Sequence, residues 1–546
     1  MADYTRGSDW THGVWEVTDA PFIRTEPARL GVGGMVCTVD HLASVAAARM
    51  IANGGNAVDA AVTASAVLAV TTQQSCGMGG DLWAMVHVPG NPVPFALNAS
   101  GRAGSGSDAA QLRAQGHTAM PFRDDIRSTP VPGCVDGWVT LHERFGSLPL
   151  NEILAPAVEF ATSGFPTSPL LAAAVHRIAN TVGNDDYFPD GAPVQTGQRV
   201  TRPGVARSLR AIGAGGRAAW YEGEFGSGLR VLAPELFSVA DLERSQADWV
   251  DAVAVDAWGH RIWSVPPNSQ GYLTLAGAVI ADGLELPDDP HDPLWGHLLI
   301  ESAKQAAFDR GAVLFEGADG NALVSESRLA PRRAEISATE VAAVAPPTGG
   351  GGTIYLCSAD GQGMGVSLIQ SNASGFGTHL AEPGVGVFLQ NRGVGFSLEE
   401  GHPAELVPGR RPPSTLSPAL ATTIEGDLRA VFGAMGGDGQ PQVVLQLAAR
   451  LLQGHQDPGR VITDSRFTLT VPDAIGFDTW DKSDQLTVAV EEGSGWEDGL
   501  RSRGHRVDVR PWGEGLFGHA HMIDVRADHL AGVADPRALI GAAVGV

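Results

Sequence analysis

The pattern of apolar and polar positions in the first hundred residues predicts a strand, two helices and a second strand. These elements fall at residues 33–39, 41–53, 57–70 and 82–88. Asp40 and Asn56 stand at the N-cap positions of the two helices, and Gly54-Gly55 ends the first with the left-handed conformation that glycine permits. The second helix is apolar on nearly every face, so we expect it to be buried.

Farther along the chain, the pattern of apolar and polar positions changes at residue 353. Residues 131–345 alternate helical patterns, such as 150–164, with Pro- and Gly-containing turns. Short strand patterns follow at 353–359, 363–371, 419–426, 428–435 and 519–527, with one helix at 442–454. Strands and helices both abound without regular βαβ alternation. The pattern therefore predicts an α+β protein built as a layered sandwich.

Composition narrows the class of protein. The chain has 546 residues, 43% hydrophobic and 18% charged, which is long enough for one large domain or several ordinary ones. Its net charge of −24 opposes binding to nucleic acid backbones. The four cysteines show no CxxC spacing and lie far apart in sequence, which favours a reducing compartment. No signal peptide pattern opens the chain, and the apolar stretch 60–70 is too short to span a bilayer, so we expect a cytoplasmic protein without membrane contact.

Three motifs with possible chemistry have simpler explanations. Residues 513–518 read GEGLFG, but a strand-like segment follows where a dinucleotide site needs a helix. His519 and His521 lie on one side of that strand without a recognisable third metal ligand, which favours packing or surface histidines. Cys76 in QSCGMGG is a candidate nucleophile, but a buried cysteine is the commoner state. We therefore predict no metal site and no cofactor.

Residues 346–360 read PPTGGGGTIYLCSAD and allow two interpretations. The glycines alone indicate a linker. The alternative is a cleavage site between Gly352 and Thr353, because an N-terminal threonine carries its own base, an α-amine with a pKa of about 8. Glycines before the threonine allow the strained backbone in which its hydroxyl attacks the preceding carbonyl.

Two further segments end predicted strands. PPSTLSPAL, at 412–420, presents the hydroxyls of Ser414 and Thr415. GAMGGDGQP, at 433–441, offers consecutive glycine N–H groups of the kind an oxyanion hole needs. Each segment taken alone is typical of a turn.

The set of motifs, in its order and spacing, resembles the gamma-glutamyltransferase family of N-terminal nucleophile hydrolases. The matching segments are GGNAVDAAVTASAVLAV, QQSCGMGGDLW, TPVPGCVDGWVTLHERFGSLPL, GGTIYLCSADGQGMGVSLIQSNASGFG, PPSTLSPAL and GAMGGDGQP. They extend over nearly the whole chain, and together they are far more specific than any one of them.

The resemblance implies a four-layer αββα sandwich made as a precursor and cut before a nucleophilic threonine, which by position is Thr353. It implies a large subunit, 1–352, and a small subunit, 353–546, whose strands interleave. Gly436 and Gly437 match the family's oxyanion glycines. Ser414 and Thr415 match its carboxylate-binding hydroxyl pair, and Ser371 falls where a hydroxyl supports the nucleophile.

The departures from the family pattern concern the residues that bind the α-carboxylate and the α-amine of the substrate. The arginine that grips the substrate's α-carboxylate is replaced by Ser100, with Arg102 two residues on. Arg392 and Gly395 stand where the polar and acidic residues that bind the α-amine are expected, and Asn372 is the asparagine nearest to a displaced family asparagine. An arginine here would repel an ammonium group, and its fork suits a small carboxylate. The segment LQNRG resembles the acylases and amidohydrolases of the family.

These features predict an autoprocessed amidohydrolase or acylase that acts on a small amide through an acyl-enzyme on Thr353, without a metal or organic cofactor. Its expected partners are that substrate and its own cleaved subunit in a heterodimer, with association of two heterodimers left open. One alternative is a true gamma-glutamyl transferase or glutathione hydrolase in which Arg102 replaces the missing arginine. Another is a non-catalytic binding homologue that stays uncut, since Ile354 stands where the family usually has threonine after the nucleophile.

Overall fold

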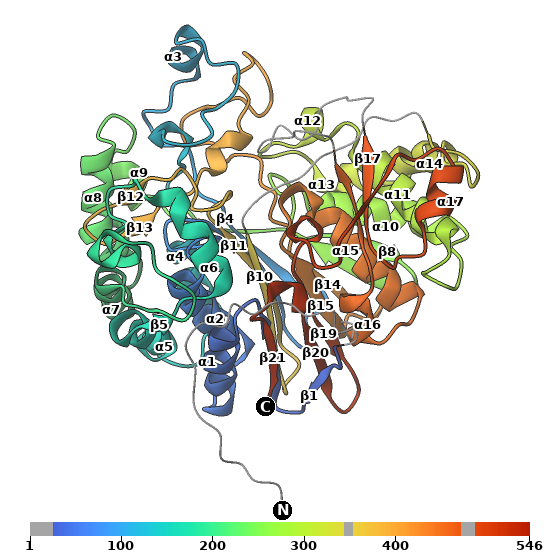
Figure 1. The fold of residues 1–546 in the computed structure, drawn as a ribbon, viewed down its shortest axis with the longest axis horizontal. Coiled ribbons are helices and arrows are strands. Elements are labelled where there is room, and N and C mark those ends of the chain that lie inside the picture. Colours follow the sequence, from blue (N-terminus) through green and yellow to red (C-terminus); the bar gives the residue numbers. More distant parts are fainter. Residues whose placement is uncertain (1–25, 343–352, 471–485) are drawn as a thin grey trace, which may run out of the picture.

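The computed structural model describes residues 26–342, 353–470 and 486–546. Two seven-stranded sheets face each other at the centre, and helices cover the outer face of each (Figure 1). The described residues thus form the four-layer αββα sandwich that the resemblance implied.

The first sheet mixes strands from both sides of residue 353. Its hydrogen-bonded order is β21 (Ala542–Gly545), β2 (Gly34–Thr38), β10 (Ile354–Asp360), β11 (Gly365–Ser371), β3 (Asp81–His87), β4 (Phe95–Ala99) and β7 (Asp248–Val250). All its neighbouring strands are antiparallel.

The second sheet also combines strands from both sides of residue 353. Its order is β1 (Arg29–Gly31), β20 (Leu530–Ala534), β19 (Ala520–Val525), β15 (Leu428–Ala434), β14 (Ala419–Thr422), β9 (His260–Ser264) and β8 (Val253–Ala257). Three smaller sheets consist of β5 (Phe165–Pro166) with β6 (Arg199–Val200), β12 (Ala381–Glu382) with β13 (Val387–Phe388), and β16 (Phe467–Thr470) with β17 (Thr487–Glu491) and β18 (Val507–Arg510).

Strand β10 explains how the core divides. Because side chains alternate along a strand, Ile354 and Leu356 face the helices while Tyr355 and Cys357 pack in the layer between the sheets. Cys357 lies directly opposite Cys37 on the neighbouring strand β2. The cysteines that are distant in sequence therefore include one pair of direct neighbours. All four are buried free thiols.

The helices that cover the first sheet include the two predicted near the N-terminus. The layer and its edges contain α1 (His41–Ala52), α2 (Ala57–Thr71), α4 (Cys134–Phe145), α5 (Leu150–Ser163), α6 (Pro169–Val175), α7 (Pro203–Tyr221), α8 (Glu224–Leu232) and α9 (Val239–Glu243). Helix α3 (Ala109–Ala114) lies apart at the top of Figure 1 and packs in a separate small cluster. Asp40 and Asn56 are the N-caps of α1 and α2, as expected, and every residue of α2 is buried.

A second group of helices covers the other sheet. It consists of α10 (Tyr272–Asp282), α11 (Pro293–Ala307), α12 (Arg310–Val313), α13 (Gly320–Leu323), α14 (Glu326–Ala334), α15 (Gln440–Ala448), α16 (Pro458–Thr463) and α17 (Glu497–Ser502). The helix predicted at 442–454 is α15 continued by a π-helical turn, Ala449–Gln453. Among the described residues, the helices are too short or too polar to cross a membrane.

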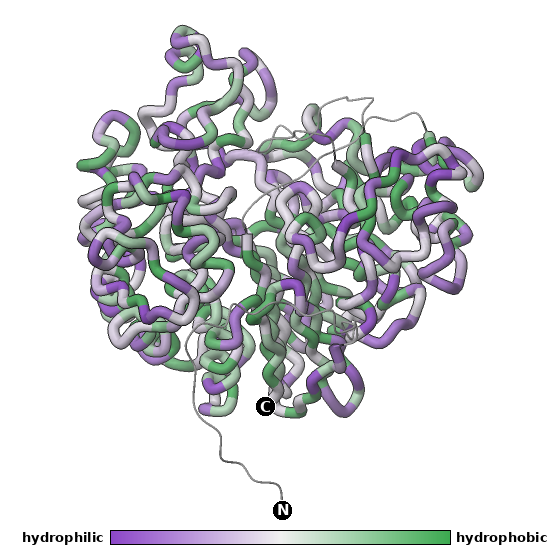
Figure 2. Tube along the Cα trace, viewed as in Figure 1, coloured by the Kyte–Doolittle hydropathy of each residue, from purple (hydrophilic) through white to green (hydrophobic). Residues whose placement is uncertain are grey.

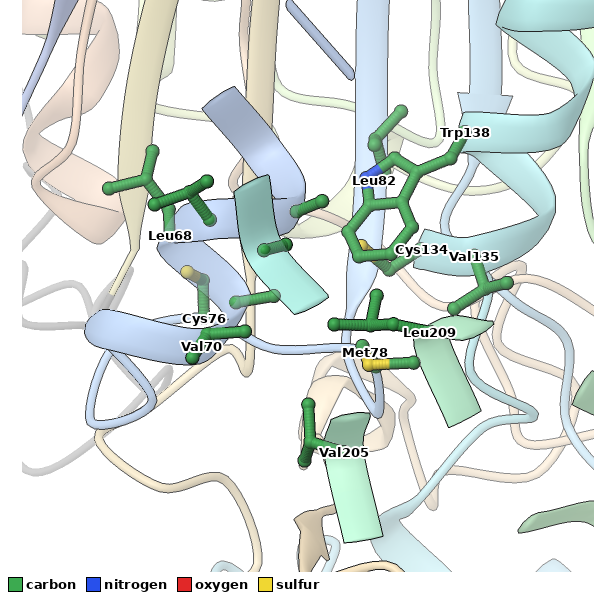
Figure 3. Close-up of a cluster of buried hydrophobic side chains, with 14 of the residues drawn as sticks. Leu68, Val70, Cys76, Met78, Leu82, Cys134, Val135, Trp138, Val205 and Leu209 are labelled. Atoms are coloured by element: carbon green, nitrogen blue, oxygen red, sulfur yellow. The ribbon is translucent and has the colours of Figure 1, made fainter. Parts of the chain in front are cut away.

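Hydrophobic residues concentrate in the central strands, and hydrophilic residues are more frequent in the outer loops (Figure 2). Figure 3 shows one part of the core, where α2, β3, α4 and α7 meet. Cys76 lies in this cluster with Leu68 and Val70, and burial raises the pKa of its thiol to about 12. A thiol that stays protonated is a poor nucleophile, so Cys76 serves packing.

Candidate active site

Three polar side chains stand in a row across the ends of neighbouring strands in the first sheet. Thr353 immediately precedes β10, Ser371 ends β11 and Asp81 begins β3. The strand register pairs Ile354 with Gln370 and Ser371 with Asp81, which aligns Thr353 with Ser371. Antiparallel pairing of distant segments thus gathers the three residues.

The hydroxyls of Thr353 and Ser371 are hydrogen-bonded, with 3.0 Å between the two Oγ atoms. Both residues are buried. The Ser371 hydroxyl also accepts a hydrogen bond of 2.8 Å from the backbone N–H of Ala373, which fixes its position. Gly352, on the other side of the predicted cleavage site, lies outside the described residues, so the bond itself and the subunit boundary stay predictions.

The glycine pair at the end of β15 has the backbone freedom that a donor loop needs. Gly436 has φ of 150° and Gly437 has φ of 57°, values that residues with a side chain rarely adopt. The carbonyl of Gly436 accepts from the N–H of Gly439 at 3.0 Å within a short turn, η6 (Gly437–Gly439). Since the N–H of Gly437 belongs to the same peptide plane, it points the opposite way, out of the turn.

Side chains hold this loop from both ends. The Gln270 amide donates to the carbonyl of Gly437 at 2.9 Å. The next residue, Asp438, forms a buried ion pair with Arg310, with 3.2 Å between Nη2 and Oδ1. The backbone N–H of Met435 donates to the carbonyl of His519 at 2.9 Å. The glycines are therefore flexible by type but fixed by their surroundings.

Ser414 and Thr415 are buried in the segment that leads into β14. The Ser414 hydroxyl accepts from the backbone N–H of Leu416 at 3.3 Å. The Thr415 hydroxyl accepts from Nη1 of Arg392 at 2.8 Å, and the Thr415 carbonyl accepts from Gln270 at 3.0 Å. Gln270 therefore connects this hydroxyl pair with the glycine loop.

Arg392 belongs to a short helical turn, η5 (Arg392–Gly395), and is fully buried. Its Nε donates to Asp81 at 2.7 Å and its Nη1 donates to Thr415. Burial lowers the pKa of Arg310, and the nearby charge of Arg392 lowers it further. The structure thus brings Arg392 together with Thr415 and with the row that contains Ser371. The guanidinium group of Arg392 already uses part of its donor capacity on the Asp81 carboxylate.

Asn372 follows Ser371 and is also buried. Its side-chain amide donates to the carbonyl of Gln73 at 3.1 Å. Its Oδ1 has no hydrogen-bond partner among the described residues and lies beside Gly80, where a side chain would collide with it. The close approach at Gly80 fixes Asn372 next to the row of polar residues.

Arg102 belongs to a different cluster. Its guanidinium pairs with Asp248 at 2.5 Å and Glu316 at 2.9 Å, and it donates to the carbonyl of Gly409. Arg411 shares Asp248 and approaches the Ser100 hydroxyl at 3.4 Å. Within the described ranges, the ion pairs and hydrogen bonds of Arg102 are therefore made in this cluster and not with Thr353 or the hydroxyl pair, and its predicted role stays a prediction.

A small pocket with a volume of about 30 Å³ adjoins Thr353. The polar residues beside Thr353 in its lining are Thr72, Gln74, Ser75, Ser168 and His519. Burial lowers the pKa of His519 to about 4, so its imidazole is neutral at neutral pH. The described lining of this pocket therefore carries no charge at that pH.

The other candidates from the sequence have structural roles. His521 is fully buried and accepts from the backbone N–H of Asp535 at 3.2 Å, and burial lowers its pKa to about 3. The GEGLFG segment forms a short helical turn, η8 (Gly515–Phe517), followed by strand β19, as expected. Neither feature has the geometry of a cofactor site.

One group among the described residues has the composition of a metal site: His297, Glu301 and His505. Its atoms already bind one another and their neighbours. Nδ1 of His297 lies 2.7 Å from Nε2 of His505, and Lys304 donates to Glu301 at 2.8 Å. Because the Lys304 ammonium supplies the positive charge, the group serves as an anchor for residues 337–342, whose backbone His297, Glu301 and Lys304 hold.

Several residues around Thr353 had little or no signal in the sequence that distinguishes them. Asp81 and Asp438 lie inside motifs that the sequence singled out for their glycines, GGDLW and GGDGQ. Gln270 and Arg310 belong to ordinary-looking segments and reach the site only through tertiary contacts. For Asp81 and Asp438, the available signal was an acidic residue inside a motif that already stood out, whereas Gln270 and Arg310 had none.

An αββα sandwich with a threonine hydroxyl at the start of a central strand defines the chain as an enzyme of the N-terminal nucleophile hydrolase class. The gamma-glutamyltranspeptidase family profile matches residues 43–545, and the chain belongs to this family. This agrees with the resemblance seen in the sequence.

Individual relatives are similar over most of the chain. The glutathione hydrolase-like YwrD proenzyme of Bacillus subtilis (strain 168) is 32% identical, covering 95% of this chain and 99% of its own length. The oxamate amidohydrolase proenzyme of Klebsiella pneumoniae is 31% identical, covering 87% and 91%. Cephalosporin acylase from Bacillus halodurans has a crystal structure that matches with a TM-score of 0.88 and 29% identity, over 98% of this chain and 99% of its own.

Proposed function

We propose that the chain cuts itself between Gly352 and Thr353 and then hydrolyses small amides with Thr353 as the nucleophile. The observation that carries the proposal is the buried hydrogen bond of 3.0 Å between the hydroxyls of Thr353 and Ser371, at the start of a central strand. Relatives whose names include "proenzyme" support the cleavage. The two resulting subunits, 1–352 and 353–546, stay together as a heterodimer.

In the proposed reaction, the new α-amine of Thr353 takes the proton of its own hydroxyl while Oγ1 attacks the substrate's amide carbonyl. Ser371 orients the nucleophile. The N–H groups of Gly436 and Gly437 stabilise the negative oxygen of the tetrahedral intermediate. The ammonium gives its proton to the leaving nitrogen, the C–N bond breaks, and water then releases the acyl group from Thr353.

We propose that the acyl part of the substrate carries a carboxylate or carbonyl group and no amine, as in oxamate. Ser414, Thr415 and Arg392 would receive that group, with Asn372 beside them. The buried cation Arg392 disfavours an ammonium group at this position, because two like charges in a buried site repel strongly. The similarity to an oxamate amidohydrolase supports this substrate class.

The pocket next to Thr353 would receive the leaving group. Since its described lining is uncharged at neutral pH, it suits ammonia or a neutral amine better than a charged amino acid or dipeptide.

A second candidate function is hydrolysis or transfer of a gamma-glutamyl group. The family profile and the similarity to a glutathione hydrolase-like proenzyme favour it. It requires a binding site for the α-amine of glutamate, and the arginine at position 392 opposes that site.

Denaturing gels and a substrate panel test these proposals together. We expect the natural protein to give two bands that divide before Thr353, Thr353→Ala to give one inactive band, and Thr353→Ser to keep cleavage because it keeps the hydroxyl. A natural protein that stays intact and inactive would instead support an unprocessed binding homologue.

For the cleaved enzyme, we expect ammonia release from oxamate and little release of p-nitroaniline from gamma-glutamyl-p-nitroanilide. Acetamide, which lacks the carboxylate, is the matched control for oxamate. Faster p-nitroaniline release with glycylglycine as acceptor would overturn the amidohydrolase proposal in favour of a transferase.

A further inference from the structure

Gln270 lies in the loop between β9 and α10, and its side chain is fully buried. Gln270 precedes residue 353 in the chain, but its side chain contacts two segments that follow residue 353. The backbone N–H of Gln270 donates to the carbonyl of Ser414 at 2.9 Å. The backbone contact brings its side chain to the two segments that carry the predicted hydroxyl pair and the predicted oxyanion glycines.

The side-chain amide of Gln270 donates to two carbonyls at once. Its Nε2 lies 3.0 Å from the carbonyl oxygen of Thr415 and 2.9 Å from that of Gly437. A carbonyl oxygen can only accept, so both neighbours require the NH₂ group at this position. An NH₂ group has two hydrogens, and here each has its own acceptor.

The bridge matters because Gly437 has no side chain with which to fix its own orientation. Its φ of 57° is available to glycine at little cost, and neighbouring conformations are equally accessible. Anchoring the Gly437 carbonyl restrains the peptide that follows Gly437, while the Gly436 carbonyl restrains the one before it. The N–H groups of Gly436 and Gly437 can then keep one direction without reorganising during the reaction.

We propose that Gln270 is a positioning residue that holds the oxyanion loop in register with the Ser414–Thr415 segment. It acts through Gly437 and Thr415, and it contributes to turnover more than to substrate affinity. This inference rests on the proposed function, in which Gly436 and Gly437 stabilise the intermediate.

The test is Gln270→Glu, which keeps the size and shape of the side chain but replaces both donors with acceptors. We expect kcat per cleaved subunit to fall about 10- to 100-fold, because removal of an oxyanion donor costs about 100- to 1000-fold and here the donors are only misplaced. KM for oxamate should change less than about threefold, since the loop interacts chiefly with the transition state.

The pH profile gives a readout that a merely structural role would not move. A protonated glutamic acid regains one O–H donor, and burial raises the pKa of such a carboxyl. The activity of Gln270→Glu relative to the natural enzyme should therefore recover as the pH falls.

Gln446 provides a matched control. It is fully buried in α15, and its Nε2 donates to the carbonyls of Gln442 and Phe467 at 3.0 and 2.9 Å. Gln446→Glu should lower thermal stability without the selective loss of kcat or its recovery at lower pH. Gln270→Met, which lacks polar atoms, serves if Gln270→Glu does not fold.

An unchanged kcat in folded Gln270→Glu and Gln270→Met, an equal kcat loss in Gln446→Glu, or a loss confined to KM would each overturn the inference. So would failure of both folded Gln270 variants to be cut, because the role would then lie in maturation and not in turnover. Retained activity in Thr353→Ala would instead refute the proposed function, which keeps the two failures distinguishable.

Discussion

The carboxylates around Arg392 and those around Arg102 differ in their exposure to water. Arg392 and its partner Asp81 are both fully buried, and the pair is completed by the neutral hydroxyl of Thr415. Arg102 pairs with two carboxylates, and the side chains of Asp248 and Glu316 are 47% and 30% exposed. The carboxylate of the first cluster is closed to water, and the two carboxylates of the second are partly open to it.

The pKa values of the two aspartates reflect this difference. Burial raises the pKa of Asp81, and the charge and hydrogen bonds of Arg392 offset only some of that effect. Burial also acts upward on Asp248, but the hydrogen bonds and charges of Arg411 and Arg102 outweigh it, so its pKa is lowered. Two arginines stabilise the carboxylate of Asp248, while one arginine stabilises that of Asp81.

The largest expected effect is on stability. Asp81→Asn keeps the shape of the side chain but leaves the buried Arg392 without its carboxylate, which should reduce the free energy of unfolding by about 3–5 kcal/mol. Asp248→Asn should cost less, because the Asp248 carboxylate is half exposed and Glu316 remains beside both Arg102 and Arg411. Urea denaturation of the uncut Thr353→Ala protein measures both, and equal losses would contradict the comparison.

Substrate binding should separate the two arginines next. Arg392→Lys cannot contact Asp81 and Thr415 with one planar fork, so KM for oxamate should rise about tenfold, or about 1.4 kcal/mol. Arg102→Lys should leave KM within about twofold. Initial-rate measurements on cleaved enzyme check this, and a larger effect at Arg102 would favour the gamma-glutamyl alternative.

The smallest expected effect is a pH dependence of KM. Because the pKa of Asp81 is raised and that of Asp248 is lowered, acidification protonates Asp81 while Asp248 stays ionised. The positive charge of Arg392 is then less neutralised where the substrate carboxylate is proposed to bind. KM for oxamate should therefore fall on acidification, even though kcat declines as the Thr353 amine is protonated. The trend should be absent in Asp81→Asn, and a KM that rises on acidification would contradict it.

Local signals in the sequence predicted much of the fold. Asp40 and Asn56 cap their helices as expected, because a cap depends on residues within one turn. Antiparallel partners such as Cys37 and Cys357 were not predicted, since strand pairing joins segments far apart in the chain. The layered sandwich could be predicted as a class, and its order of strands came only from the structure.

The same limit applies to the candidate site. Thr353, Gly436 and Thr415 stood out because each lies in a segment with its own pattern, and Ser371 was named through the family resemblance. The partners of the arginines did not, because Asp81 is 311 residues from Arg392 and no local pattern links them. Whether Arg102 and Arg392 contact substrate depends on these partners, which is why their roles stay proposals.

The strand order of the two sheets has a consequence for how the protein is made. In the first sheet, β10 and β11 lie between β2 and β3, so two strands that follow residue 353 fill a gap between strands that precede it. A separately synthesised piece 353–546 would expose both edges of that hairpin, a common start of aggregation. If the chain is cut before Thr353 as proposed, we therefore expect synthesis to finish and the whole chain to fold before that cut. Dilution after the proposed cut should not separate the two pieces, because ladders of hydrogen bonds join residues before and after 353 in both sheets.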